Sequence, residues 1–217
     1  MPTYASPTFA ATYQGLCDKI ADTLNRQDLT AAIPDFTVLA TAKIERDIVR
    51  TRHPSAISTS TIVANAIATS LPADFVSAYQ VMLTSSGKHL QYVSPEDTRL
   101  LFEQQATSDA TDKYYTIIAN KLRVLPAPSA SSTLSVDLYY YARLAAINTT
   151  NTTNWVLTRY PDLYLYAALT HTAPYLKNDE RIALWDGLYS KILTEIEMEA
   201  DRAMRPQSVL NARARSF

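Results

Sequence analysis

The segment NWVLTRYPDLYLYAALTHTAPYLKNDERIALWDGLYSKILTEIEMEADRAMR, residues 154–205, carries the longest helical pattern of the chain and predicts two or three consecutive helices. The last of them is expected to begin at about Asp179, because Asn178 offers a capping acceptor. It is expected to end near Arg205, because Pro206 cannot continue the hydrogen-bond ladder. Apolar and small side chains recur every three or four positions and form one packing seam, Ile182, Trp185, Tyr189, Ile192, Ile196 and Ala203.

The helix before it is expected to be buried on several sides. Pro161 suits a first helical position, and apolar residues from Leu163 to Ala173 cover more than half of the circumference. Pro174 would break or kink this helix near Ala173. The two helices therefore predict an antiparallel helical hairpin.

Two further helices are predicted at the N-terminal end. The first covers residues 13–26, and the second runs from Pro34 to about Arg50, with an inner face of Phe36, Leu39, Ala40, Ile44 and Ile48. Residues 43–52 mix lysine and arginine with acids, which indicates either a solvated helix face or a subunit contact.

The middle of the chain changes from helical to strand periodicity. Hairpins are predicted for residues 79–93, around Thr84-Ser85-Ser86-Gly87, and for residues 114–125, around Asn120-Lys121. A short helix is expected between them, from Ser94 to about Gln105. Residues 59–68 could supply an edge strand, and residues 133–141 alternate strictly, so that one face is expected to be buried.

These patterns predict an α+β, mainly α fold: a bundle of N- and C-terminal helices with a β-rich hairpin insert and an extended C-terminal tail. With 217 residues, 47% of them hydrophobic, the chain is long enough for one large core or two small ones. We expect one subunit with four parts, residues 1–55, 56–146, 147–205 and 206–217.

Composition excludes several classes of function. No apolar run is long enough for a membrane span, and no signal segment is expected. A net charge of −1 argues against nucleic-acid binding through a basic surface. Glycine-rich phosphate loops do not occur. The single cysteine, Cys17, is expected to be a buried and inert thiol on the first helix.

We find no pattern that predicts catalysis, a metal site or a cofactor. The three histidines, His53, His89 and His171, lie far apart in sequence. Acids crowd the end of the last helix, but a solvated acidic face explains them better than a hydrolytic pair; they are Glu195, Glu197, Glu199 and Asp201. The protein is therefore not expected to be an enzyme. The tyrosines, 14 in all, are interpreted as core and interface residues.

Three segments carry a resemblance to a known family. The first spans residues 13–36 and contains YQGL, LNRQDL and IPDF; the second is LPADF at 71–75; the third spans residues 154–176 and contains NWVL, YPDLYLYAAL and APYL. In this order they resemble the head-to-tail connector, or adaptor, proteins of tailed bacteriophages. Each motif consists of packing and turn residues, so the resemblance rests on their order along most of the chain.

The resemblance implies a structural protein of the virion neck, assembled in the host cytoplasm. Such adaptors form a homo-oligomeric ring, commonly of twelve copies, between the portal protein and a tail or nozzle protein. Double-stranded DNA passes through the ring during ejection without sequence-specific binding. The C-terminal arm typically docks on the portal, which would assign that role here to Val209, Leu210, Arg213, Arg215 and Phe217.

Two other functions remain open from the residues alone. A cellular protein-interaction module could be built from the same helices. A cell-wall hydrolase would need a pair of carboxylates, for which Glu195, Glu197 and Glu199 are the candidates.

Overall fold

A computed structural model describes residues 11–64, 68–98, 113–128, 134–176 and 180–204. The fold is α+β and mainly α, as predicted. The chain forms two compact units, a helical unit from its two ends, Met1–Pro54 and Leu144–Phe217, and a β-rich unit, Ser55–Arg143. The bounds of the β-rich unit lie within a few residues of the insert expected at 56–146. None of the described helices is both long enough and apolar enough to cross a membrane.

Capping side chains mark where several helices of the helical unit begin. Thr12 accepts a hydrogen bond from the amide of Gly15 at the start of α1, and Asn154 does the same for Leu157 in α4. Pro161 occupies the first turn of α5, as predicted. The helices are α1 Tyr13–Leu24, α2 Ile33–Thr51, α4 Trp155–Arg159, α5 Pro161–Thr170 and α6 Arg181–Met204, with 3₁₀ turns η1 Gln27–Ala32 and η3 Ala173–Tyr175.

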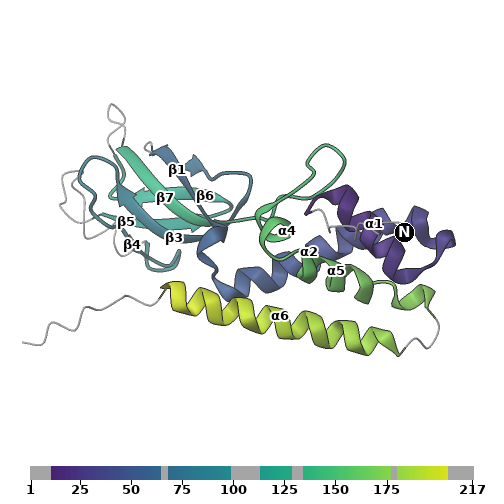
Figure 1. The fold of residues 1–217 in the computed structure, drawn as a ribbon. Coiled ribbons are helices and arrows are strands. Elements are labelled where there is room, and N and C mark those ends of the chain that lie inside the picture. Colours follow the sequence, from purple (N-terminus) through teal and green to yellow (C-terminus); the bar gives the residue numbers. More distant parts are fainter. Residues whose placement is uncertain (1–10, 65–67, 99–112, 129–133, 177–179, 205–217) are drawn as a thin grey trace, which may run out of the picture. The chain divides into compact units, whose positions relative to one another are not determined.

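Helix α5 is the centre of the helical unit (Figure 1), where it contacts α1, α2, α4 and α6. Its apolar side chains point in all directions, and Leu163, Tyr164, Ala167, Ala168 and Leu169 are fully buried. This confirms the prediction that the segment is buried on several sides. The buried Tyr164 hydroxyl accepts a hydrogen bond from the Asn154 side chain at 2.7 Å, so the polar atom has a partner in the core.

The predicted helix over residues 161–173 is too long by one turn. It ends at Thr170, and the Thr170 and Thr172 hydroxyls donate to the carbonyls of Ala167 and Leu169. The chain then makes the 3₁₀ turn that contains Pro174. Threonine hydroxyls that donate to carbonyls of the preceding turn compete with the backbone hydrogen bonds that would continue the helix. Proline also stops the helix, because it has no amide hydrogen to donate.

Two residues of the predicted helix faces are misplaced. Leu39 lies on the outer side of α2, and Thr37 and Thr41 are buried on the inner side. Burial of these threonines is possible because the Thr37 hydroxyl donates to the Pro34 carbonyl and the Thr41 hydroxyl donates to the Thr37 carbonyl. Ala203 is exposed at the end of α6, because Ala200, one turn earlier, is the last buried residue of that helix.

The first sheet of the β-rich unit has three antiparallel strands in the order β1-β7-β3. The strands are β1 Ile57–Ala64, β3 Phe75–Leu83 and β7 Leu134–Ala142. The predicted edge strand is confirmed as β1, although it starts at Ile57 and its last residue is Ala64. The alternation predicted for β7 is also confirmed, because Val136, Leu138 and Tyr140 are buried.

The second sheet has the order β2-β6-β5-β4. The hairpin predicted for residues 114–125 is confirmed, but its turn lies one residue earlier than predicted, with Ala119 and Asn120 in the left-handed region and Lys121 already in the second strand. The strands are β2 Thr69–Ser70, β4 Gln91–Tyr92, β5 Tyr114–Ile118 and β6 Lys121–Leu125. One apolar core is shared by the two sheets, with Val81, Leu122, Val124, Val136 and Leu138 among its members.

The hairpin predicted for residues 79–93 is correct only at its turn. Met82 and His89 form a single bridge around that turn. The main partner of β3 is β7, and β4 pairs in parallel with β5 in the other sheet. Val81 and Leu83 thereby reach the core beside β7, which a local hairpin cannot provide. The predicted short helix after Ser94 lies mostly outside the described residues.

Candidate interaction surface

The packing seam predicted for α6 lies against the core of the helical unit. Trp185, Tyr189 and Ile196 are buried there, and Ile182 and Ile192 are half-buried against the same core. Arg181 lies over the Trp185 ring, with the guanidinium carbon 5.3 Å from the ring centre. These residues hold the subunit together and leave the opposite side of α6 at the surface.

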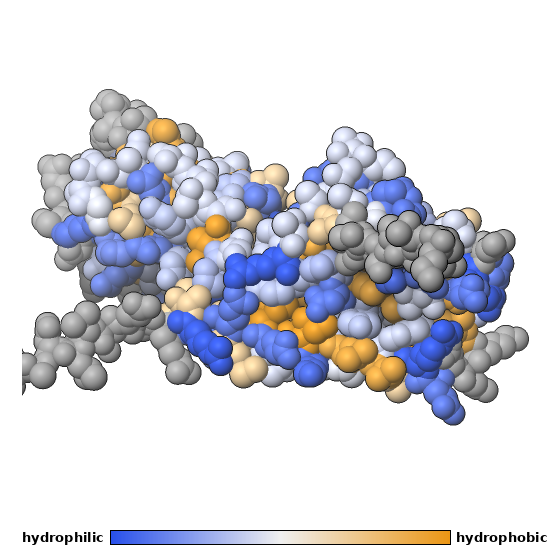
Figure 2. Space-filling model, in the orientation of Figure 1, coloured by the Kyte–Doolittle hydropathy of each residue, from blue (hydrophilic) through white to orange (hydrophobic). Residues whose placement is uncertain are grey.

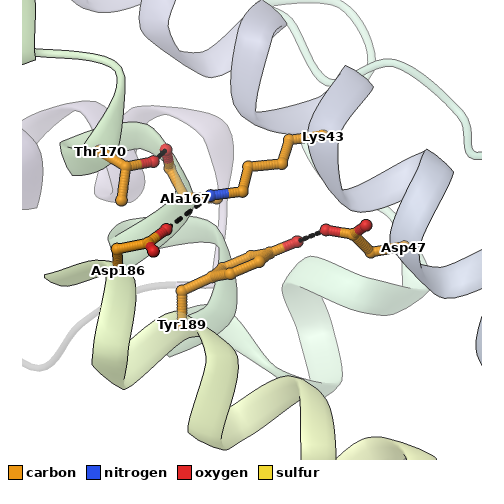
Figure 3. Close-up of polar contacts among 6 residues, drawn as sticks. All are labelled: Lys43, Asp47, Ala167, Thr170, Asp186 and Tyr189. Atoms are coloured by element: carbon orange, nitrogen blue, oxygen red, sulfur yellow. Dashed lines mark hydrogen bonds and ion pairs between the residues drawn. The ribbon is translucent and has the colours of Figure 1, made fainter.

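A polar cluster joins the middle of α2 to the first half of α6 (Figure 3). The Lys43 ammonium lies 3.1 Å from the Asp186 carboxylate and 4.2 Å from the centre of the Tyr189 ring. The Tyr189 hydroxyl donates to the Asp47 carboxylate at 2.5 Å. Burial raises the pKa of Tyr189, and the hydrogen bond to Asp47 raises it further, so the hydroxyl keeps its proton and remains a donor.

This cluster corrects the solvated-face interpretation of residues 43–52 for Lys43 and Asp47, while the alternative, a subunit contact, stays a prediction. Lys43 and Asp47 are engaged within the subunit, where they connect α2 to α6. Arg46 and Arg50 remain exposed. The charged residues of this segment therefore fall into two groups, those bonded within the subunit and those exposed. Their spacing in the sequence does not distinguish the two groups.

A second polar cluster joins the end of α2 to α4, α5 and the last part of α6. His53 is almost completely buried and stacks on Trp155, with ring centres 5.1 Å apart. The Tyr160 hydroxyl donates to the Glu199 carboxylate at 2.7 Å, and Arg159 forms an ion pair with Glu199. Glu199 occupies a position where the spacing of the α6 seam predicts another apolar residue. Its contacts with Tyr160 and Arg159 explain why a carboxylate is found there.

Burial and the neighbouring groups shift the pKa values of the titratable side chains in this second cluster. Burial lowers the pKa of His53, and Arg159 lowers it further, while Glu199 opposes them. The Tyr160 hydrogen bond lowers the pKa of Glu199. Burial and Glu199 together raise the pKa of Tyr160 to about 12. Glu199 is therefore a bonded, ionised link between helices, which corrects its assignment to a solvated acidic face.

The described residues include one cysteine and no cluster of metal-ligating side chains. Within the described ranges, no group of three His, Cys, Asp or Glu side chains could hold a metal ion. Cys17 is half-buried where full burial was expected, and burial raises the pKa of its thiol. It lines a shallow groove of about 300 Å³ between α1 and α2, together with Tyr13, Ala21, Ile33 and Pro34.

Apolar side chains do, however, gather on the outside of two helices. On α2, Val38 is 63% exposed and Leu39 is 48% exposed; on α6, Leu184 is 59% exposed and Met198 is 47% exposed. Val38 and Leu39 are neighbours, so this part of α2 is a candidate contact surface. The β-rich unit exposes Val63, Tyr79 and Tyr92.

Sequence reasoning missed these outer residues because it sorted apolar positions onto one inner face per helix. One signal was available: in Val38-Leu39-Ala40 only some of three consecutive apolar residues can face inward. Leu184 likewise falls outside the seam of α6. The portal-docking residues inferred from the resemblance, Val209, Leu210, Arg213, Arg215 and Phe217, lie outside the described residues.

A family model described as SU10 adaptor protein matches residues 11–210 of the chain. The match covers both units, from the start of α1 to beyond the end of α6. None of the curated proteins matches the chain.

Proposed function

Because the chain belongs to the family of SU10 adaptor proteins, which are phage structural proteins, we propose that it forms a ring between the portal and the tail of the virion. The observation that carries this proposal is the family match over nearly the whole chain. In this role the protein sits in the virion neck, and double-stranded DNA passes through the ring during ejection. Twelve copies are the number that the resemblance implies.

The arrangement of the helical unit supports a structural role. Several of its polar side chains connect helices, as in the Tyr189–Asp47 and Tyr160–Glu199 hydrogen bonds. Its exposed apolar side chains lie on helix surfaces, where another protein can cover them. A subunit whose helices are joined by polar contacts and which also exposes apolar side chains is suited to assembly.

The C-terminal residues are proposed to dock on the portal. Val209, Leu210 and Phe217 would enter apolar grooves, and Arg213 and Arg215 would bind carboxylates, because the arginine side chain can donate two hydrogen bonds to one carboxylate. The opposite side of the ring would receive the tail or nozzle protein.

Mass measurement tests the assembly part of this proposal. The purified protein is examined by native mass spectrometry alone and after mixing with the portal protein. A closed ring of many copies, alone or on the portal, is expected. A protein that stays a single folded chain in both samples contradicts the proposal.

A further inference from the structure

Apolar residues reach the surface of the helical unit in more than one place (Figure 2), and between α1 and α2 they line a shallow groove. Tyr13, Cys17 and Ala21 recur every four residues along α1, so they form one wall of this groove. Ile33 and Pro34, at the start of α2, form the other wall. We call this feature the α1–α2 groove.

The α1–α2 groove is suited to an uncharged ligand. Among the lining residues that the structure describes, Asp18 is the one with a charged side chain. Its carboxylate accepts a hydrogen bond from the Gln14 side chain at 2.8 Å, and Thr30 and Thr149 add hydroxyl groups to the lining. Burial of apolar side chains in such a groove is favourable, whereas burial of charged side chains costs hydration.

The start of the described chain lies beside this groove. The Thr153 hydroxyl donates to the Ala11 carbonyl at 3.2 Å, and the amide of Tyr13, itself a groove residue, donates to the Thr152 carbonyl at 2.7 Å. Both contacts tie the chain to the loop before α4, and the same loop borders the groove. Residues 1–10 therefore join the described chain next to the groove.

The composition of residues 1–10, MPTYASPTFA, matches the lining of the groove. The segment contains no charged side chain and has two aromatic ones, Tyr4 and Phe9. Pro2 and Pro7 lack an amide hydrogen and restrict the residues before them to extended conformations, so the sequence favours an extended segment over a helix. An extended, uncharged segment with two aromatic side chains is the kind of ligand that an apolar groove accepts.

We propose that residues 1–10 lie in the α1–α2 groove of their own copy, with Tyr4 and Phe9 against its apolar walls. This inference goes beyond the proposed ring and does not depend on it. The two aromatic side chains exchange water for the side chains of Cys17 and Ala21, which is favourable because apolar area leaves water on both sides of the contact. The groove is then filled within the subunit, so other proteins bind other surfaces.

Length and tethering favour the same copy as the source of this segment. Ten extended residues span up to about 33 Å, whereas the groove follows α1 from Tyr13 to Ala21, which is roughly 12 Å. The segment can therefore turn back at its junction with α1 and still reach the far end of the groove. A segment tethered this closely has an effective concentration on the order of millimolar, which a second copy reaches only in concentrated solution.

Reaction of Cys17 with iodoacetamide tests the proposal, because this thiol lines the groove and belongs to the single cysteine of the chain. One full-length variant carries Tyr4→Ser and Phe9→Ser. The matched control carries Leu210→Ser and Phe217→Ser, which removes two apolar side chains near the other end of the chain. Mass spectrometry measures the rate at one pH, since the thiolate is the reactive form, and over a range of protein concentrations without the portal protein. Circular dichroism checks that both variants fold.

A segment that fills the groove about 90% of the time leaves the thiol open for about 10%, so the variant without Tyr4 and Phe9 should react roughly tenfold faster than the unchanged protein. The control should react at the unchanged rate, and dilution should not alter the rate of the unchanged protein. Equal rates in the unchanged protein and the first variant, or an equal rise in the control, would overturn the proposal. A rate that rises on dilution would also overturn it, because a second copy would then cover the groove. None of these results bears on the ring, which native mass spectrometry tests separately.

Discussion

The hydroxyl of Tyr189 on α6 donates to the carboxylate of Asp47 on α2 at 2.5 Å, and this bond lies at the edge of the apolar core. The two residues are 142 positions apart in the chain. The bond therefore joins the N-terminal and C-terminal parts of the helical unit, together with the neighbouring Lys43–Asp186 pair.

Replacing Tyr189 by phenylalanine should destabilise the helical unit. Tyr189→Phe removes the donor and leaves the Asp47 carboxylate without this partner, at a cost of roughly 1.5–3 kcal/mol for a hydrogen bond to a charged group. Tyr166→Phe is the control, because its hydroxyl forms no hydrogen bond with the described residues. Urea unfolding measures both variants, and equal midpoints for the two would argue against a stabilising role of the Tyr189–Asp47 bond.

Truncating Trp185 tests the packing seam of α6. Trp185 is 5% exposed, and Trp185→Ala should cost about 3–5 kcal/mol of unfolding free energy. Its neighbour Leu184 points outward, so Leu184→Ala should change the unfolding free energy by less than about 0.5 kcal/mol. An unchanged thermal midpoint for Trp185→Ala would contradict the assignment of this face to the core.

The buried His53 should make the protein less stable in mild acid. Its pKa is lowered in the folded state relative to the usual 6.5, so above that pH both states are neutral and the group contributes nothing. Below pH 6.5 the unfolded chain binds the proton more readily, and the free energy of unfolding falls until the folded pKa is reached. His171 is shifted in the same direction and adds to this loss.

Urea unfolding at pH 7.5 and pH 5.5 measures this loss. The variant His53→Phe retains an aromatic ring to stack on Trp155, and it should lose less stability between the two conditions than the unchanged protein. Equal losses in the two proteins would show that His53 is not the group responsible.

The β-rich unit is expected to contribute contacts in the assembly. Its three-stranded sheet ends in β1 and β3, and the parts of these strand edges that residues 88–90 leave unpaired are surfaces that other chains can cover. Hydrogen exchange compares the isolated protein with the assembled particle. Amides of residues 79–93 and 114–125 should exchange more slowly after assembly, and unchanged exchange in both ranges would exclude the unit from the contacts.

Removing the C-terminal residues should separate attachment from folding. Deletion of Gln207–Phe217 leaves every described element in place, so the thermal midpoint should not change. The truncated protein should fail to join portal-bearing, DNA-filled heads. Attachment at full occupancy would contradict the portal-docking role of this segment.

Sequence patterns predicted those helices and strands in which buried residues recur at a regular spacing. The strict alternation before Tyr141 located β7, and the seam around Trp185 located α6. The β3–β7 ladder could not be predicted, because it joins residues more than fifty positions apart and the turn at Gly87 also fits a local hairpin. Contacts of β3 with the rest of the β-rich unit, and not its local sequence, determine that it pairs with β7.

The candidate surface was harder to predict than the fold. Hydrophobicity alone assigned Leu39 to the core, although the hydroxyls of Thr37 and Thr41 find acceptors within α2 and take the inner positions. Charge alone assigned Glu199 to solvent, although Tyr160 and Arg159 bind it. In both cases the missing information was a hydrogen-bond partner.

Imaging of the full-length protein on phage heads gives the clearest decision on the adaptor function. Purified protein is incubated with portal-bearing, DNA-filled heads that lack it, and electron cryomicroscopy counts the heads with added density at the portal. A ring of this protein on the portal of most heads is expected. Bare portals, at concentrations where the protein is folded and in excess, would contradict the proposal that it is a head-to-tail adaptor.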